Sequence, residues 1–246
     1  MKQSFCTDTP IEDTIKAASS CVDMRKELAE ALGHKSRSVR EYASQAMVEL
    51  ARDDAQQIQD FAGDIVDALN RPESLTRYSM IEVIGELADA QPKLVMDAHE
   101  ALQDCLYDED SGTVRLYAFR ILARYGATGS ARSIKVWPDL SMALRCFHGD
   151  SEFMAMMNET IKMLDGRADI SVKEAAVELF AFDAEHARGE MRKKAEAISE
   201  FAPEVLARIN RENEEKAKAA SAAKEAQKAA AEADAEDAEE EESTHS

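Results

Sequence analysis

Apolar residues recur along this chain in a repeated helical pattern. Four segments that begin near residues 36, 73, 110 and 149 align almost without gaps when they are placed under one another. A shared column holds Arg40, Arg77, Arg115 and Met154, at successive intervals of 37, 38 and 39 residues. The third, sixth, seventh and tenth positions after this column are mostly apolar, a spacing that predicts one buried stripe on a helix. These positions are Ala43, Ala46, Met47 and Leu50; Met80, Val83, Ile84 and Leu87; Ala118, Ile121, Leu122 and Tyr125; and Met157, Thr160, Ile161 and Leu164.

A second predicted helix precedes each of these helices and ends on a leucine. The leucines are Leu32, Leu69, Leu106 and Leu144, whose spacing of 37, 37 and 38 residues keeps the same period. Short polar connectors follow, with the sequences HKSRS, RPES, DEDSG and HGDS, and they carry residues that end or cap helices. The repeat is therefore a helical hairpin. Stacked hairpins share a core and curve into a solenoid, so we expect one helix of each hairpin outside and its partner on the concave side.

The start of the repeated helix resembles a motif of the HEAT repeat family, a Val-Arg pair. Val39-Arg40 and Val114-Arg115 match both residues, Thr76-Arg77 keeps the arginine, and Phe153-Met154 keeps neither. The resemblance covers roughly residues 20 to 165. It implies an all-α fold, a right-handed α-solenoid of about four to five HEAT-like helical hairpins.

The HEAT family also carries an aspartate six residues before that arginine. Here the position holds His34 and Arg71 in the first two repeats and Glu109 in the third. We therefore do not expect a regular ladder of Asp-Arg pairs between repeats.

The pattern divides the chain into three parts. Residues 1–35 are expected to form an N-terminal helical cap, and residues 36–210 a HEAT-like repeat domain with closing helices. Residues 211–246 form an acidic tail rich in Ala, Glu and Lys that ends EADAEDAEEEESTHS. Because this ending contains no large apolar residue, the tail is expected to be disordered or a solvated helix.

Composition supports a helical chain and argues against nucleic acid and membranes as its partners. Nine Gly and five Pro among 246 residues are too few for a strand-rich fold. The formal charge of −19 repels phosphate backbones and anionic lipid surfaces, so nucleic acid and membrane are not expected as partners. The first twenty residues lack a secretory signal pattern and the four cysteines are scattered, which predicts a cytoplasmic protein with reduced thiols. The sequence does not indicate the oligomeric state.

The sequence contains no recognisable catalytic or metal-binding motif. Gly126-Ala127-Thr128-Gly129 lacks the lysine of a phosphate-binding loop, and no G-x-S-x-G motif occurs. Cys146 and His148 lack a third ligand. His99-Glu100 is similar to the pairs of a HEAT-like iron hydroxylase family, but that family uses several such pairs and this chain has one. We therefore expect no cofactor, no metal and no enzymatic activity.

Carboxylates gather on the solvent side of the second helix of two hairpins. This helix is predicted to bury Ile58, Ile65, Leu69, Val95, Ala98, Leu102 and Leu106. Six acidic residues remain for solvent, namely Asp60, Asp64, Asp67, Asp97, Glu100 and Asp104. If this side is concave, it concentrates negative potential and favours an extended basic segment. The sequence thus predicts a scaffold that binds a protein or basic peptide there.

Two alternatives remain open. The first alternative is that the six carboxylates form a solvated helix face, as in any acidic protein. The second alternative is an enzyme-associated HEAT-like module, either a lyase subunit or a degenerate relative of a DNA glycosylase. It would bind an anionic substrate at the basic cluster, which comprises Arg115, Arg120, Arg124, Arg132 and Lys135.

Overall fold

The computed structural model describes residues 7–211, 213–216, 218–219 and 222–223. Within these residues the chain is helical and contains no strand. It divides into an N-terminal body, Met1–Glu200, and a C-terminal segment, Phe201–Ser246. The C-terminal segment is helical over residues 202–211. Most of the predicted acidic tail, 211–246, lies outside the described residues.

The N-terminal body is a series of short helices joined by short connectors. In chain order the elements are α1 (Ile11–Ser20), α2 (Val22–Ala31), α3 (Arg37–Asp54), the 3₁₀ helix η1 (Ala55–Phe61), α4 (Ala62–Asp67), η2 (Ala68–Asn70), α5 (Ser74–Leu87), α6 (Pro92–Asp97), α7 (His99–Leu106), α8 (Gly112–Ala127), α9 (Ser130–Cys146), α10 (Phe153–Asp165), α11 (Ile170–His186) and α12 (Gly189–Ser199).

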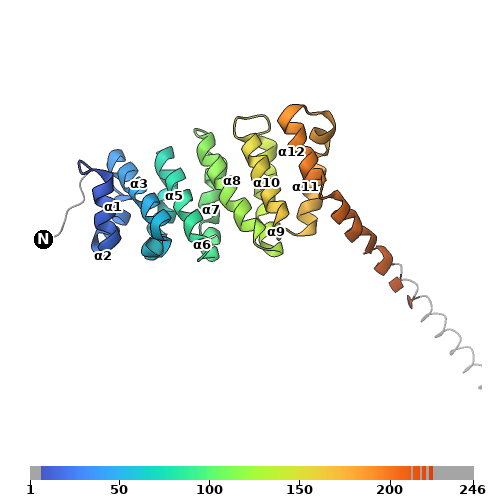
Figure 1. Ribbon diagram of the computed structural model, residues 1–246, viewed down its shortest axis with the longest axis horizontal. Helices are drawn as coiled ribbons and strands as arrows, with labels where there is room; N and C mark the ends of the chain where they lie inside the picture. The colour runs from blue at the N-terminus through green and yellow to red at the C-terminus, as the bar shows by residue number, and fades with distance from the viewer. Residues whose placement is uncertain (1–6, 212, 217, 220–221, 224–246) are drawn as a thin grey trace, which may run out of the picture. The chain divides into compact units, whose positions relative to one another are not determined.

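These helices form two layers within the N-terminal body (Figure 1). The first layer contains α1, α3, α5, α8, α10 and α12, each packed against the next. The second layer contains α2, the segment from η1 to η2, the pair α6 and α7, then α9 and α11. Each first-layer helix from α1 to α10 is followed along the chain by its second-layer partner, which confirms the predicted α-solenoid of stacked helical hairpins.

The predicted apolar stripe forms the core between the layers. Of the sixteen stripe positions named above, all are buried except Tyr125 and Ile161, which are half-buried. The four leucines that end the second-layer helices are also buried. Phe119, Phe153 and Phe180 add the largest fully buried side chains. The period of the sequence therefore places the core correctly.

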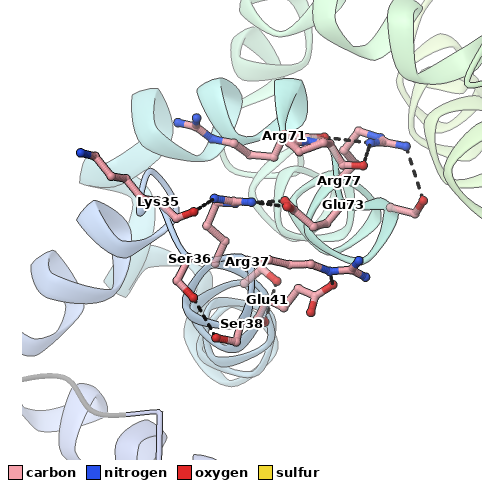
Figure 2. Close-up of polar contacts among 12 residues, drawn as sticks. Lys35, Ser36, Arg37, Ser38, Glu41, Arg71, Glu73 and Arg77 are labelled. Atoms are coloured by element: carbon pink, nitrogen blue, oxygen red, sulfur yellow. Dashed lines mark hydrogen bonds and ion pairs between the residues drawn. The ribbon is translucent and has the colours of Figure 1, made fainter.

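An arginine of the repeat column links each connector to the next one. Arg40 Nη1 donates hydrogen bonds to the carbonyl oxygens of His34 (2.6 Å) and Lys35 (3.0 Å) in its own connector. Its Nε and Nη2 donate to the carboxylate of Glu73, which belongs to the next connector (Figure 2). The hydrogen bond from Arg40 holds the pKa of Glu73 below its ordinary value of 4.5.

The same arrangement is repeated in the two following hairpins. Arg77 bonds the carbonyl oxygens of its connector and pairs with Asp108 at 2.5 Å (Figure 2 shows Arg77 beside Arg71). Arg115 bonds the carbonyl oxygen of Asp108 at 2.7 Å, and its Nε lies 2.5 Å from Glu152. The side chain at the family's aspartate position therefore takes no part in these contacts, as expected, but the prediction missed a ladder of arginine–carboxylate pairs. Its carboxylates are Glu73, Asp108 and Glu152, and each comes from the connector that follows the arginine's own hairpin.

Candidate functional site

The six predicted carboxylates all lie exposed on the second layer. Asp60 belongs to η1, Asp64 and Asp67 to α4, Asp97 to α6, and Glu100 and Asp104 to α7. The seven apolar residues predicted beneath them are buried. The structure therefore brings the six residues together on one layer of two successive hairpins, and we call this surface the acidic face. Its role in binding stays a prediction.

Charges on the acidic face are largely uncompensated. In the part of the chain that the structure describes, Asp97 pairs with Lys93 at 3.9 Å, a contact between two exposed side chains. The other five carboxylates have no ion pair with any described residue. Exposed pairs such as Lys93 and Asp97 are weak, so the six carboxylates of this face keep most of their negative charge.

Two arginines of the first layer pair between hairpins. Arg52 of α3 bonds Glu49 at 2.6 Å and also bonds Glu82 of α5. Arg124 of α8 bonds Asp89 at 2.5 Å. Glu49, Glu82 and Asp89 thus have a cationic neighbour from the same or a neighbouring hairpin, which lowers the local field around them.

A hollow of about 550 Å³ opens on the first layer between α1, α3, α5 and α8. Its apolar walls include Ile11, Ile15 and Val48, and the rings of Tyr78 and Tyr117 lie 5.5 Å apart at its other side. None of the six predicted carboxylates lines it. The sequence pattern did not predict this hollow, because it forms only when helices of three hairpins and the cap are stacked.

The predicted basic cluster is divided between α8 and α9, and its arginines are engaged. Arg115 pairs with Glu152 just before α10, Arg120 pairs with Glu159 of α10, and Arg124 pairs with Asp89. Arg132 lies over the ring of Tyr125, with its guanidinium carbon 5.1 Å from the centroid. These contacts reduce the positive potential that an anionic substrate would need.

Two histidines contact aspartates, and one cysteine is buried in the core. His99 Nε2 lies 3.0 Å from Asp139, and His148 Nε2 lies 3.1 Å from Asp183. Burial raises the pKa of the Cys105 thiol to about 12. Among the described residues, no three His, Cys, Asp or Glu side chains gather closely enough to hold a metal ion. Within the same residues, no helix is both long and apolar enough to cross a membrane.

Comparisons with known proteins identify the fold. No protein family model matches the chain, and no curated protein matches it. A designed armadillo repeat protein in complex with the peptide (KR)4 is 18% identical, covers 79% of this chain and 95% of its own, and has a TM-score of 0.60. A computationally designed armadillo repeat protein for modular peptide recognition is 17% identical over 78% of this chain and 91% of its own, also with a TM-score of 0.60.

An engineered protein is also similar, at 18% identity over 82% of this chain and 94% of its own, with a TM-score of 0.61. At these identities the likeness establishes the fold alone. The chain thus has the fold of a helical-repeat solenoid, similar to the designed armadillo repeat proteins, as the repeat pattern predicts.

Proposed function

We propose that this chain is a non-enzymatic scaffold that binds a protein partner through an extended basic segment on the acidic face. One observation carries the proposal: five of the six carboxylates there have no ion pair with a described residue, and the sixth, Asp97, has only an exposed pair with Lys93. An unpaired row of like charges disfavours the free protein, and a basic partner relieves that repulsion.

The spacing of neighbouring helices within the second layer fits such a partner. Neighbouring packed helices lie about 8–10 Å apart. An extended chain advances about 3.3 Å per residue, so about every third residue of a bound segment meets a new helix. Lysine or arginine at these positions pairs with successive carboxylates. Designed armadillo repeat proteins of the same fold, one of them in complex with (KR)4, support this mode of binding.

The cytoplasm is the proposed location. Cys21, Cys105 and Cys146 are all free thiols in the described part of the chain, which suits a reducing compartment. The observations favour the scaffold over the enzyme-associated alternative, because Arg115, Arg120 and Arg124 of the basic cluster already pair with carboxylates.

The test is binding of a labelled peptide of alternating lysine and arginine, measured by fluorescence anisotropy. A variant with Asp60→Asn, Asp64→Asn, Asp97→Asn and Glu100→Gln should raise Kd by about tenfold or more. A control variant with Asp13→Asn, Glu86→Gln, Asp165→Asn and Glu200→Gln removes the same charge from exposed positions elsewhere, and it should change Kd by less than about twofold. Equal loss of affinity in both variants would exclude the acidic face as the site.

A further inference from the structure

Large apolar side chains are exposed on two neighbouring helices of the second layer. Ile134 and Met142 of α9 are 50% and 53% exposed, and Phe182 of α11 is 70% exposed. A hollow of about 270 Å³ lies between these helices, and Trp137, Leu179 and Ala175 line it together with the polar Ser141, Arg145 and Glu178. We call Ile134, Met142, Phe182, Trp137 and Leu179 the α9–α11 patch.

The patch differs from the ordinary scatter of apolar atoms on a protein surface. The described residues include five large hydrophobic side chains that are exposed, and three of them belong to α9 and α11. Exposed aromatic and methionine side chains on neighbouring helices are typical of surfaces that receive an apolar anchor from a partner. Methionine adds a flexible wall that adapts to the shape of that anchor.

The acidic face and the α9–α11 patch follow one another along the second layer. Asp139 of α9 accepts a hydrogen bond from Gln103 of α7 at 2.8 Å and lies 3.0 Å from His99, so α7 and α9 are adjacent. Helix α11 packs next to α9 on the other side. A segment that lies along the acidic face therefore reaches the patch by continuing in the same direction.

We infer that the partner carries an aromatic or large aliphatic anchor beside its basic segment, and that the anchor binds the α9–α11 patch between Trp137 and Leu179. This inference rests on the proposed function, because the negative charge of the adjoining face selects the basic part of the partner. The hollow lies about one and a half helix spacings, or about 15 Å, beyond α7. An extended spacer of about four or five residues covers that distance.

The test compares synthetic peptides on the full chain. The basic peptide alternates lysine and arginine. Two anchored peptides add a phenylalanine through a short Gly-Ser spacer, one at the N-terminal end and one at the C-terminal end. The serine peptide is an anchored peptide whose basic residues are replaced with serine. Trp137 is the only tryptophan of the chain, so its emission reports directly on the hollow. One of the two anchored peptides should bind about tenfold or more tightly than the purely basic peptide and change this emission. The purely basic peptide should bind without changing it.

Substitutions in the patch separate the anchor from the basic segment. Phe182→Ser and Met142→Ser alter exposed side chains and should reduce the affinity of the anchored peptide to that of the basic peptide. Val22→Ser is the matched control, because Val22 is 64% exposed on α2 of the same layer, outside the patch. The control should leave both affinities unchanged.

The outcomes distinguish this inference from the proposed function. If the anchored and basic peptides bind with equal affinity and leave the Trp137 emission unchanged, the anchor site is overturned. Binding of the basic peptide then still supports the proposed scaffold function. Tight binding of the serine peptide overturns the link between anchor and basic segment. If the chain self-associates and Phe182→Ser abolishes this self-association, the patch binds a second copy of the chain, and the inference is also overturned. Failure of every peptide to bind removes the proposed function itself.

Discussion

At the scale of single residues, one recurring arginine explains how successive hairpins are connected. Arg40 lies within the motif that resembles the HEAT family, yet its carboxylate partner, Glu73, lies 33 residues later. The side chains are only 11% and 5% exposed, so each charge depends on the other for compensation. The sequence identified the arginine because it recurs with the repeat. The partner's identity depended on how the next hairpin stacks.

Arg40→Ala should therefore destabilise the protein strongly. Removal of one partner leaves Glu73 buried without its cation, and the expected loss is about 3 kcal/mol of unfolding free energy. Arg192→Ala is the control, because Arg192 is 51% exposed and pairs with Glu196 on the surface, away from the Arg40–Glu73 pair, so its loss should stay below about 0.5 kcal/mol. Urea unfolding followed by circular dichroism measures both. Similar losses in the two variants would contradict a structural role for the ladder.

The Arg40–Glu73 pair should also make stability depend on pH. Because Arg40 lowers the pKa of Glu73 in the folded protein, the pair contributes fully above the ordinary value of 4.5 and its contribution is lost as pH falls through the lower folded value. The difference in unfolding free energy between wild type and Glu73→Gln should be large at about pH 7 and shrink below about pH 4. A difference that stays constant over this range would show that the carboxylate charge is not involved.

Cysteine reactivity gives another test at this scale. Cys105 is buried with a pKa raised to about 12, so almost no thiolate forms near neutral pH. Alkylation by iodoacetamide should label the exposed Cys21 and Cys146 in the native protein and spare Cys105 until the protein unfolds. Peptide mass spectrometry locates the labels. Rapid labelling of Cys105 under native conditions would contradict its burial.

At the scale of elements, the close approach of neighbouring helices fixes the stacking. The residue after α10, Gly166, lies against the last residue of α8: an added Cβ would stand 2.6 Å from the carbonyl oxygen of Ala127. That same oxygen accepts a hydrogen bond from the backbone N–H of Arg167 at 2.7 Å. Backbone atoms cannot move aside as a flexible side chain can, so glycine is required at this contact.

Gly166→Ala should destabilise the protein by about 1–3 kcal/mol, because relieving the clash separates the ends of α8 and α10. Gly63→Ala in α4 is the matched control. Nothing lies within 4 Å of an added Cβ there, and alanine favours the helix, so stability should stay constant or rise by about 0.5–1 kcal/mol. Thermal unfolding of the two variants compares them. Equal unfolding midpoints for the two variants would mean that the backbone around Gly166 accommodates a Cβ without loss of stability.

At the scale of the whole molecule, the net charge of −19 opposes compaction. Raising NaCl from about 0.02 M to about 0.2 M should screen this repulsion and raise the thermal midpoint by about 2–4 °C. The buried ladder pairs are screened less than exposed charges, so they do not reverse the trend. Differential scanning calorimetry at several salt concentrations measures the effect. A midpoint that falls with salt would show that attractive surface pairs outweigh the repulsion.

The sequence by itself determined the repeat, the hairpins and the buried stripe, because helical periodicity assigns each residue to a face without reference to distant neighbours. It also placed residues such as Asp64 and Glu100 correctly in solvent. The ion pairs between hairpins, such as Arg40 with Glu73, were visible only in the folded protein. The same is true of apolar side chains that stay exposed to solvent, such as Phe182. Those properties depend on how one hairpin meets the next, across more than thirty residues of chain, and no local pattern encodes that distance.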